Sequence, residues 1–164
     1  MLIANTHRPG LQALQAEFPE QIAAVRELFL EYAESLSFTL CFQSFDKELA
    51  GLPGGYAAPD GRLLLAMFDG QPAGCVALHK IDDHVCEMKR LYVRPQFRGK
   101  GLGKALAERI INEARAIGYK KLRLDTVEPV MRTAVGMYRQ LGFREIAPYR
   151  ANPIEGALYM ELRL

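Results

Sequence analysis

The stretch that decides the fold is Arg98-Gly99-Lys100-Gly101-Leu102-Gly103, a glycine-rich turn between a strand-like run that ends at Val93 and a helix-like run. Glycines let the backbone bend tightly and approach a ligand closely. The first N–H groups of a helix have no intrahelical partner, and the helix dipole adds positive partial charge there. The basic side chains of the turn, together with Lys104, add the same sign. The stretch therefore predicts that residues 98–104 bind a phosphate-bearing ligand.

The spacing of this turn excludes two common phosphate-binding loops. A P-loop in this register requires Gly at position 98 and Ser or Thr at position 105, where the chain has Arg98 and Ala105. A dinucleotide-binding fingerprint requires a small residue at position 104 or 106, where the chain has Lys104 and Leu106. The pattern that remains is Arg-x-x-Gly-x-Gly.

Length and composition fit a single domain spanning residues 1–164, with 49% apolar and 24% charged residues. The net charge of +2 is too small to indicate nucleic-acid binding. No apolar run approaches the roughly 20 residues that span a bilayer, and residues 1–8 do not resemble a signal peptide. Three scattered cysteines, Cys41, Cys75 and Cys86, predict buried thiols in a reducing compartment and no metal site. We therefore expect a cytoplasmic protein.

Hydrophobic periodicity predicts the elements of the first half. Residues 11–17 form a first strand, and Pro19 opens a helix with one apolar face. A short helix follows from Phe45 to Leu52, with Ser44 as its N-cap. Two strands, Arg62 to Phe68 and Pro72 to Leu78, flank an Asp69-Gly70 hairpin turn. The apolar face of the first helix contains Ile22, Val25, Phe29, Tyr32 and Leu36.

The strand from Val85 to Val93 changes its pattern midway. Apolar residues occupy even positions first, at Cys86 and Met88, and odd positions later, at Leu91 and Val93. A regular strand keeps one parity. The switch predicts a β-bulge near Lys89-Arg90, which adds one residue and redirects the side chains that follow.

The second half predicts a strand–helix–strand unit and two final strands. The helix from Leu102 to Ile117 ends at Gly118 and precedes a strand from Lys121 to Thr126. Strands from Phe143 to Ile146 and Leu158 to Leu164 end the chain. We therefore predict a mixed α/β (α+β) fold, a central sheet with helices on both faces. A further helix before Gly142 carries Met131, Ala134, Val135, Tyr138 and Leu141.

Three segments in this order resemble the GCN5-related N-acetyltransferase (GNAT) superfamily. Residues 87–95 resemble its fourth strand, and residues 98–103 resemble its acyl-CoA pyrophosphate loop. The pattern Ala134-x-x-Met137-Tyr138-x-x-x-Gly142-Phe143 resembles its Ala…Tyr…Gly-Phe helix and turn. The resemblance implies a mixed, mostly antiparallel sheet in which a bulge separates the fourth strand from the fifth. Acyl-CoA enters that opening in the family.

The resemblance also implies that acetyl-CoA is the co-substrate, and the absence of a His/Cys/Asp spacing typical of metal ligands predicts that no metal takes part. Leu91, Tyr92 and Val93 would lie along the pantetheine, with the backbone of Leu91 and Val93 pairing with its amides. Arg98 either closes over the pyrophosphate or pairs with a surface carboxylate, and Lys100 and Lys104 are either ligands or solvated charges. The backbone N–H groups that would bind the pyrophosphate belong to Gly99, Lys100, Gly101, Leu102, Gly103 and Lys104.

Two residues are expected to carry the chemistry. By its helical spacing alone Tyr138 is better explained as a core tyrosine, whereas the resemblance implies that it protonates the departing CoA thiolate. Glu87 is expected to be the base that deprotonates the amine, or else to form an ion pair with Lys89 or Arg123. His84 is the second candidate base. The family often has an asparagine where this chain has Met131, which puts one polar contact to the cofactor in doubt.

These residues predict an N-acetyltransferase in which a primary amine attacks the thioester directly. The alternative is a non-enzymatic acyl-CoA-binding sensor or interaction module. The acceptor, a small molecule or a peptide amine, is not identified by the sequence. Tyr149 to Gly156, together with Tyr32, Phe38 and Phe42, are expected to line its pocket. A homodimer is a further expectation from the family.

Overall fold

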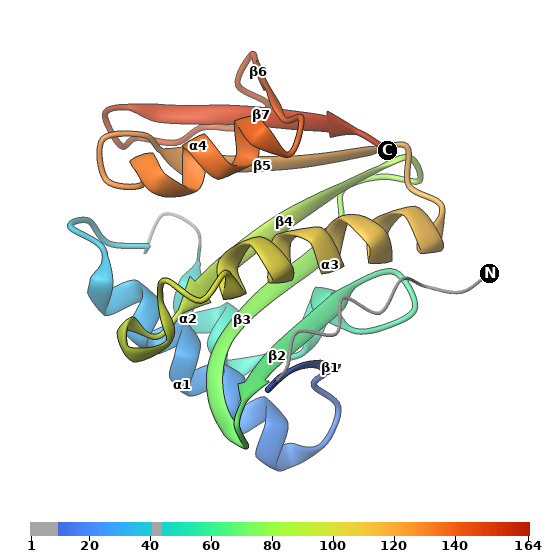
Figure 1. Cartoon of the computed structure of the whole chain (residues 1–164). Coiled ribbons are helices and arrows are strands. Elements are labelled where there is room, and N and C mark those ends of the chain that lie inside the picture. The colour runs from blue at the N-terminus through green and yellow to red at the C-terminus, as the bar shows by residue number, and fades with distance from the viewer. Residues whose placement is uncertain (1–9, 41–43) are drawn as a thin grey trace.

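The computed structural model describes residues 10–40 and 44–164 and contains one seven-stranded sheet with the order β1-β2-β3-β4-β5-β7-β6 (Figure 1). The strands are β1 (Leu11–Gln15), β2 (Arg62–Phe68), β3 (Gln71–Lys80), β4 (Val85–Val93), β5 (Lys121–Val127), β6 (Arg144–Ile146) and β7 (Ala157–Arg163). The α-helices are α1 (Pro19–Ser35), α2 (Phe45–Ala50), α3 (Leu102–Ile117) and α4 (Arg132–Gln140), and short 3-10 helices span Gly54–Tyr56 and Pro95–Phe97.

The sheet is mostly antiparallel, as predicted, and its one parallel pair, β4 with β5, creates the opening at its centre. The parallel ladder runs only from the Val85–Lys121 pair to the Glu87–Arg123 pair, although β4 continues to Val93. Beyond Glu87 the two strands separate, and β4 keeps β3 as its neighbour on the other edge. The sheet therefore opens toward the carboxyl ends of β4 and β5.

Helices cover both faces of the sheet and divide the core in two. On one face, α3 and α4 pack through residues such as Leu106, Ile110 and Val135 against the central strands. On the other face, α1 and α2 pack through Val25 and Phe29 among others. The predicted apolar stripes of the two long helices are confirmed by this packing, because apolar residues three and four apart share one helical face.

The predicted bulge lies in β4 at Arg90. Cys75 of β3 pairs with Tyr92, whereas Ala77 pairs with Lys89, so that two residues of β3 span three of β4. Arg90 has a φ of 60°, the left-handed conformation that an L-residue with a long side chain rarely adopts. The extra residue explains the parity switch in the sequence, since it rotates the side chains that follow to the other face.

Glu48 of α2 holds the bulge in place. Arg90 donates from Nε to Oε2 and from Nη2 to Oε1 of Glu48, both at 2.9 Å. The guanidinium also lies over the Phe45 ring, with 5.1 Å between the guanidinium carbon and the ring centroid. The two charged side chains are only 3% and 15% exposed, so the pair is shielded from water. The short helix α2 therefore secures the strained turn of β4.

Some details differ from the sequence prediction. The helix expected to reach Leu52 ends at Ala50, and Ser44 stands at its N-cap position without a capping hydrogen bond from its side chain. Cys75 and Cys86 are buried thiols, and Cys41 lies outside the described residues. Within the described ranges, no helix is long and apolar enough to cross a membrane. The cytoplasmic location and the homodimer stay predictions.

The Glu48→Gln variant is expected to lose about 3–5 kcal/mol of unfolding free energy, because it leaves the Arg90 guanidinium buried without a counter-ion. Urea denaturation measures this loss. Glu128→Gln is the control, since the Glu128–Arg139 pair is about half exposed (43% and 54%) and such surface pairs contribute about 0–1 kcal/mol. Equal effects of the two substitutions would contradict the importance of the Arg90 pair.

Candidate acetyl-CoA cleft and catalytic site

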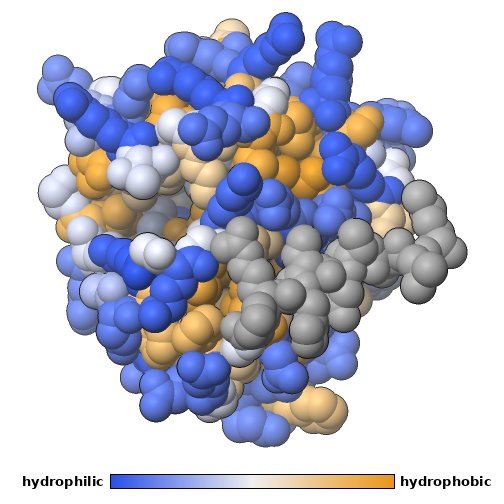
Figure 2. Space-filling view, in the orientation of Figure 1, coloured by the Kyte–Doolittle hydropathy of each residue, from blue (hydrophilic) through white to orange (hydrophobic). Residues whose placement is uncertain are grey.

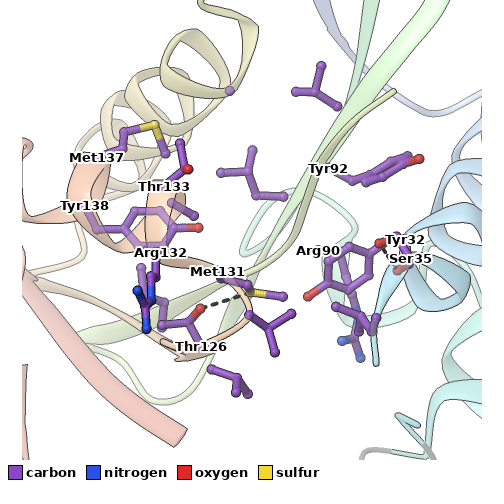
Figure 3. A pocket seen from close by; sticks show the side chains of 18 of the residues that line it. Tyr32, Ser35, Arg90, Tyr92, Thr126, Met131, Arg132, Thr133, Met137 and Tyr138 are labelled. Atoms are coloured by element: carbon purple, nitrogen blue, oxygen red, sulfur yellow. Dashed lines mark hydrogen bonds between the residues drawn. The ribbon is translucent and has the colours of Figure 1, made fainter. Parts of the chain in front are cut away.

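A cleft of about 770 Å³ occupies the opening between β4 and β5. Its walls come from β4, β5, the turn before α3, the start of α4 and the carboxyl end of α1. Figure 2 shows the surface hollowed between α4 and the α1–α2 side of the molecule, with apolar side chains at its rim. In Figure 3, Tyr138 of α4 and Tyr32 of α1 lie on opposite sides of this space.

The glycine-rich turn forms one end of the cleft. Gly99 and Gly101 have φ values of 78° and 77°, and Gly101 is the N-cap residue of α3. A Cβ at Gly103 would approach Val93 at 3.9 Å, ordinary contact, so the turn requires glycine mainly where φ is positive. The backbone of the first turn of α3 lines the cleft. This end of the cleft offers unpaired N–H groups and positive partial charge to an anion.

The basic side chains of the turn are engaged within the protein. Arg98 donates from Nε to the carbonyl oxygen of Val93 at 2.9 Å, and its guanidinium lies 5.8 Å from the centroid of the Tyr92 ring. Arg98 forms no ion pair with a described carboxylate, and its role toward the pyrophosphate stays a prediction. The Lys100 ammonium lies 5.5 Å from the Phe68 ring centroid, and Lys104 lies 3.9 Å from Glu108. Of these three side chains, Arg98 and Lys104 line the cleft.

The edge of β4 that faces β5 provides a second binding feature. In the described part of the chain, the β4–β5 ladder ends at Glu87, so the residues from Met88 to Val93 have no sheet partner on that edge. Leu91, Tyr92 and Val93 line the cleft there. An extended molecule with amide groups can pair with such an edge as an added strand. The pantetheine arm of acyl-CoA has this chemistry, so the residues present fit the expected ligand.

Tyr138 presents its hydroxyl to the cleft. Its side chain is 7% exposed, its ring packs against Phe143 at 5.6 Å between centroids, and Figure 3 shows the hydroxyl pointing into the open space. Among the described residues, no side chain or backbone group forms a hydrogen bond with this hydroxyl. Burial raises the pKa of Tyr138, and nearby Tyr32 raises it further. The phenol is therefore protonated at neutral pH and can donate a proton.

Met131 stands immediately before α4 and lines the cleft, where the family often has asparagine. Thr126 of β5 donates a hydrogen bond from Oγ1 to the Met131 sulfur at 3.1 Å, drawn as a dashed line in Figure 3. The thioether accepts only weakly and donates nothing. This position therefore presents a thioether to the cleft instead of an amide.

Glu87 is fully buried and surrounded by donors. His79 Nε2 lies 2.8 Å from its Oε1, Tyr149 donates to its Oε2 at 2.5 Å, and Arg150 also donates to Oε2. Burial alone would raise the pKa of Glu87, but the hydrogen bond with His79 and the charge of Arg150 outweigh it and lower the pKa to about 2. Glu87 is not among the residues that line the cleft.

The other predicted partners and bases are also accounted for. Lys89 Nζ lies 4.0 Å from Glu87, whereas Arg123 pairs with Glu161 at 2.8 Å. His84 lies in the turn between β3 and β4, where its backbone N–H donates to Asp82, and it does not line the cleft. Neither Glu87 nor His84 is therefore brought next to Tyr138.

Asp125 is a site residue that no sequence pattern indicated. Of the described residues, Asp125 of β5 is the only carboxylate that lines the cleft. Arg150 donates to its Oδ1 at 2.9 Å and Asn152 to its Oδ2 at 3.2 Å, and the side chain is 8% exposed. Its place two residues beyond Arg123, where the strands separate, is visible only once the register of β4 against β5 is known.

The expected acceptor-pocket residues are partly brought together. Tyr32, Phe38 and Asn152 line the cleft. Tyr149 instead points to Glu87, with which it forms a hydrogen bond. Phe42 lies outside the described residues.

Comparison with known proteins places this architecture in a family. The sequence model of the Acetyltransferase (GNAT) family matches residues 22–143. An uncharacterised N-acetyltransferase of Schizosaccharomyces pombe is 38% identical over 150 residues, which cover 90% of this chain and 91% of that protein.

Solved structures share the fold over nearly the whole chain. An acetyltransferase from Streptococcus agalactiae has a TM-score of 0.76 and 24% identity, covering 96% of this chain and 100% of that one. A GNAT family acetyltransferase from Elizabethkingia anophelis, solved with acetyl-CoA bound, has a TM-score of 0.66 and 21% identity, covering 96% and 100%. The chain belongs to the acetyltransferase (GNAT) family and is an acetyl-CoA-dependent acyltransferase.

Proposed function

We propose that this protein transfers the acetyl group of acetyl-CoA to a primary amine, which attacks the thioester directly. The observation that carries the proposal is the cleft between β4 and β5, onto which the glycine-rich turn, the free edge of β4 and the Tyr138 hydroxyl all open. The acetyl-CoA bound to the Elizabethkingia anophelis relative supports the choice of co-substrate.

In this proposal the chain binds acetyl-CoA through its backbone. N–H groups between Gly99 and Lys104 hold the pyrophosphate, because their partial charges complement an anion at a helix N-terminus. Leu91 and Val93 pair with the pantetheine amides along the free edge of β4. When bound, acetyl-CoA supplies an activated acyl group. N–H groups of β4 that point to the thioester carbonyl stabilise the negative charge that develops on its oxygen.

Tyr138 is proposed as the general acid. Its hydroxyl faces the cleft without a hydrogen-bond partner among the described residues. Its raised pKa keeps the phenol protonated at neutral pH, so that it can donate a proton to the departing CoA thiolate. A core tyrosine normally has a hydrogen-bond partner for its hydroxyl when it is buried. The open hydroxyl of Tyr138 therefore favours the catalytic role over the structural one.

The residue that we propose as the base is Asp125 and not Glu87, which the sequence predicted. The role of Glu87 as a base stays a prediction that its geometry does not favour, because a carboxylate with a pKa of about 2 accepts protons poorly and lies outside the cleft. We propose that Asp125 meets the incoming ammonium, since it is the carboxylate that lines the cleft in the described structure. Glu87 instead positions Arg150, which in turn contacts Asp125.

Acetyl-CoA and CoA are each expected to stabilise the protein against heat, whereas ATP and NAD are not. A ligand at about 100 times its dissociation constant adds about 2.7 kcal/mol of stability. Thermal unfolding measures this shift, and Gly101→Ala should reduce it, because the N-cap residue has a positive φ. Release of CoA thiol with a panel of amines then tests turnover. Stabilisation without thiol release from any amine would favour an acyl-CoA sensor instead.

Tyr138→Phe is expected to lower kcat by about 10²–10⁴-fold while leaving the affinity for acetyl-CoA within a few fold, because it removes only the transferable proton. Steady-state kinetics and thermal shifts with acetyl-CoA measure the two quantities. Tyr119→Phe is the control, since the Tyr119 hydroxyl donates to the Asp60 carbonyl outside the cleft. A Tyr138→Phe enzyme with full turnover across the pH range would exclude the acid role.

Glu87→Gln is expected to lower the unfolding free energy by about 3 kcal/mol at neutral pH, because it leaves the Arg150 charge partly unpaired. The pKa of Glu87 falls from 4.5 to about 2 on folding, so its stabilisation is complete above pH 4.5 and is lost as the pH falls toward 2. Urea titrations at several pH values measure the difference from wild type. If Glu87 were instead the catalytic base, Glu87→Gln would abolish the increase of kcat/KM with rising pH, while the affinity for acetyl-CoA would stay unchanged.

A further inference from the structure

Lys89 is a mostly buried cation without a carboxylate closer than 4.0 Å among the described residues. Its side chain is 11% exposed, and the nearest carboxylate oxygen, on Glu87, is 4.0 Å from Nζ. Glu87 already accepts from His79, Tyr149 and Arg150. No hydrogen bond from the Lys89 ammonium to another described residue is present. Because Lys89 lines the cleft, its ammonium can donate hydrogen bonds to a ligand bound there.

The neighbouring charges are paired with one another. Arg90 is engaged by Glu48 through two hydrogen bonds, and Arg150 is shared between Glu87 and Asp125. Burial lowers the pKa of Lys89, and the charge of Arg90 lowers it further. An anion bound at Nζ would offset both effects, since an opposite charge favours the protonated amine.

Lys89 lies where two hollows meet. It lines the main cleft and also a second pocket of about 260 Å³ beneath α2 and the 3-10 helix Gly54–Tyr56. The ionisable groups of the second pocket are Lys47, Glu48, Tyr56, His79 and Lys89. Because Glu48 is already paired with Arg90, the charge left over in this pocket is positive.

Lys89 and Asp125 occupy equivalent places on the two separating strands. Glu87 pairs with Arg123 at the end of the parallel ladder, and Lys89 and Asp125 follow two residues later on the same face of the sheet. Paired strands lie about 4.8 Å apart, and these two have begun to diverge. The cleft is thus lined by a basic side chain on β4 and, on β5, by an acidic one that also contacts Arg150 and Asn152.

We propose that the acceptor is a small amino acid, held with its ammonium at Asp125 and its carboxylate at Lys89, an inference that rests on the proposed acetyl transfer. Lys89 precedes Leu91 by two residues, at most about 7 Å along β4, so a short molecule reaches both Lys89 and the thioester. The ammonium passes one proton to Asp125, and its nitrogen forms the new C–N bond as the C–S bond breaks. Tyr138 gives its proton to the CoA thiolate, and the second proton of the nitrogen passes through water to the Tyr138 oxygen, which leaves a neutral amide and a restored phenol.

The test compares matched pairs of acceptors, L-amino acids and their carboxamides, in CoA-release assays at saturating acetyl-CoA. Wild type is expected to prefer the carboxylate of at least one pair by tenfold or more in kcat/KM. Lys89→Met should abolish that preference by raising KM for the acid alone, and Lys89→Arg should restore much of it. Lys80→Met is the control, because Lys80 pairs with Asp83 outside both pockets.

The outcomes separate this inference from the proposed function. Equal transfer to acids and carboxamides, or transfer only to amines without a carboxylate, would overturn the amino-acid acceptor and leave acetyl transfer intact. No transfer to any amine, despite stabilisation by acetyl-CoA, would overturn both. Unchanged selectivity in a folded Lys89→Met enzyme would also overturn the role of Lys89.

Discussion

The extra residue at Arg90 is the constraint on which the rest of the structure depends. A parallel pair of strands that stays in register would close the sheet and leave no cleft. The bulge makes β4 bend after its ladder with β5 ends at Glu87. A left-handed arginine is costly in isolation, and the two hydrogen bonds from Glu48 together with the contact to Phe45 offset that cost. The opening for the ligand is therefore maintained by the buried ion pair between Arg90 and Glu48.

A second set of charges fixes the place where the strands part. The Glu87 carboxylate forms hydrogen bonds with His79 of β3 and with Tyr149 and Arg150 of the segment between β6 and β7. Arg150 then reaches Asp125 of β5. Buried ion pairs seldom add stability compared with apolar packing, and their better-supported use is to specify one arrangement. Here the arrangement sets the position of Asp125, and with it the chemistry of the cleft wall.

The sequence predicted what depends on local pattern. Hydrophobic periodicity located α1 and α3, the parity switch from Met88 to Leu91 located the bulge, and the glycine spacing located the helix N-terminus that lines the cleft. Side-chain partners were harder to foresee, because they depend on which strands are neighbours. Glu87 was expected at the cleft and is instead enclosed, whereas Asp125 had no expected role and lines the cleft. Strand alternation gives the face of each residue, but its neighbours depend on the β4–β5 register.

The cleft changes character along its length, and this change explains how one cavity can hold two different molecules. At the glycine-rich end the protein offers backbone N–H groups, which bind an anion without a desolvated counter-charge. Around Tyr138, Met131 and Leu91 the lining is mostly apolar, although Arg132 also lines the cleft beside Met131. At the other end of the cleft, the lining includes the charged side chains of Lys89 and Asp125. An acyl group delivered from the first end and an amine held at the last therefore meet beside Tyr138, where the partly enclosed cleft makes electrostatic effects on the reacting atoms stronger than in bulk water.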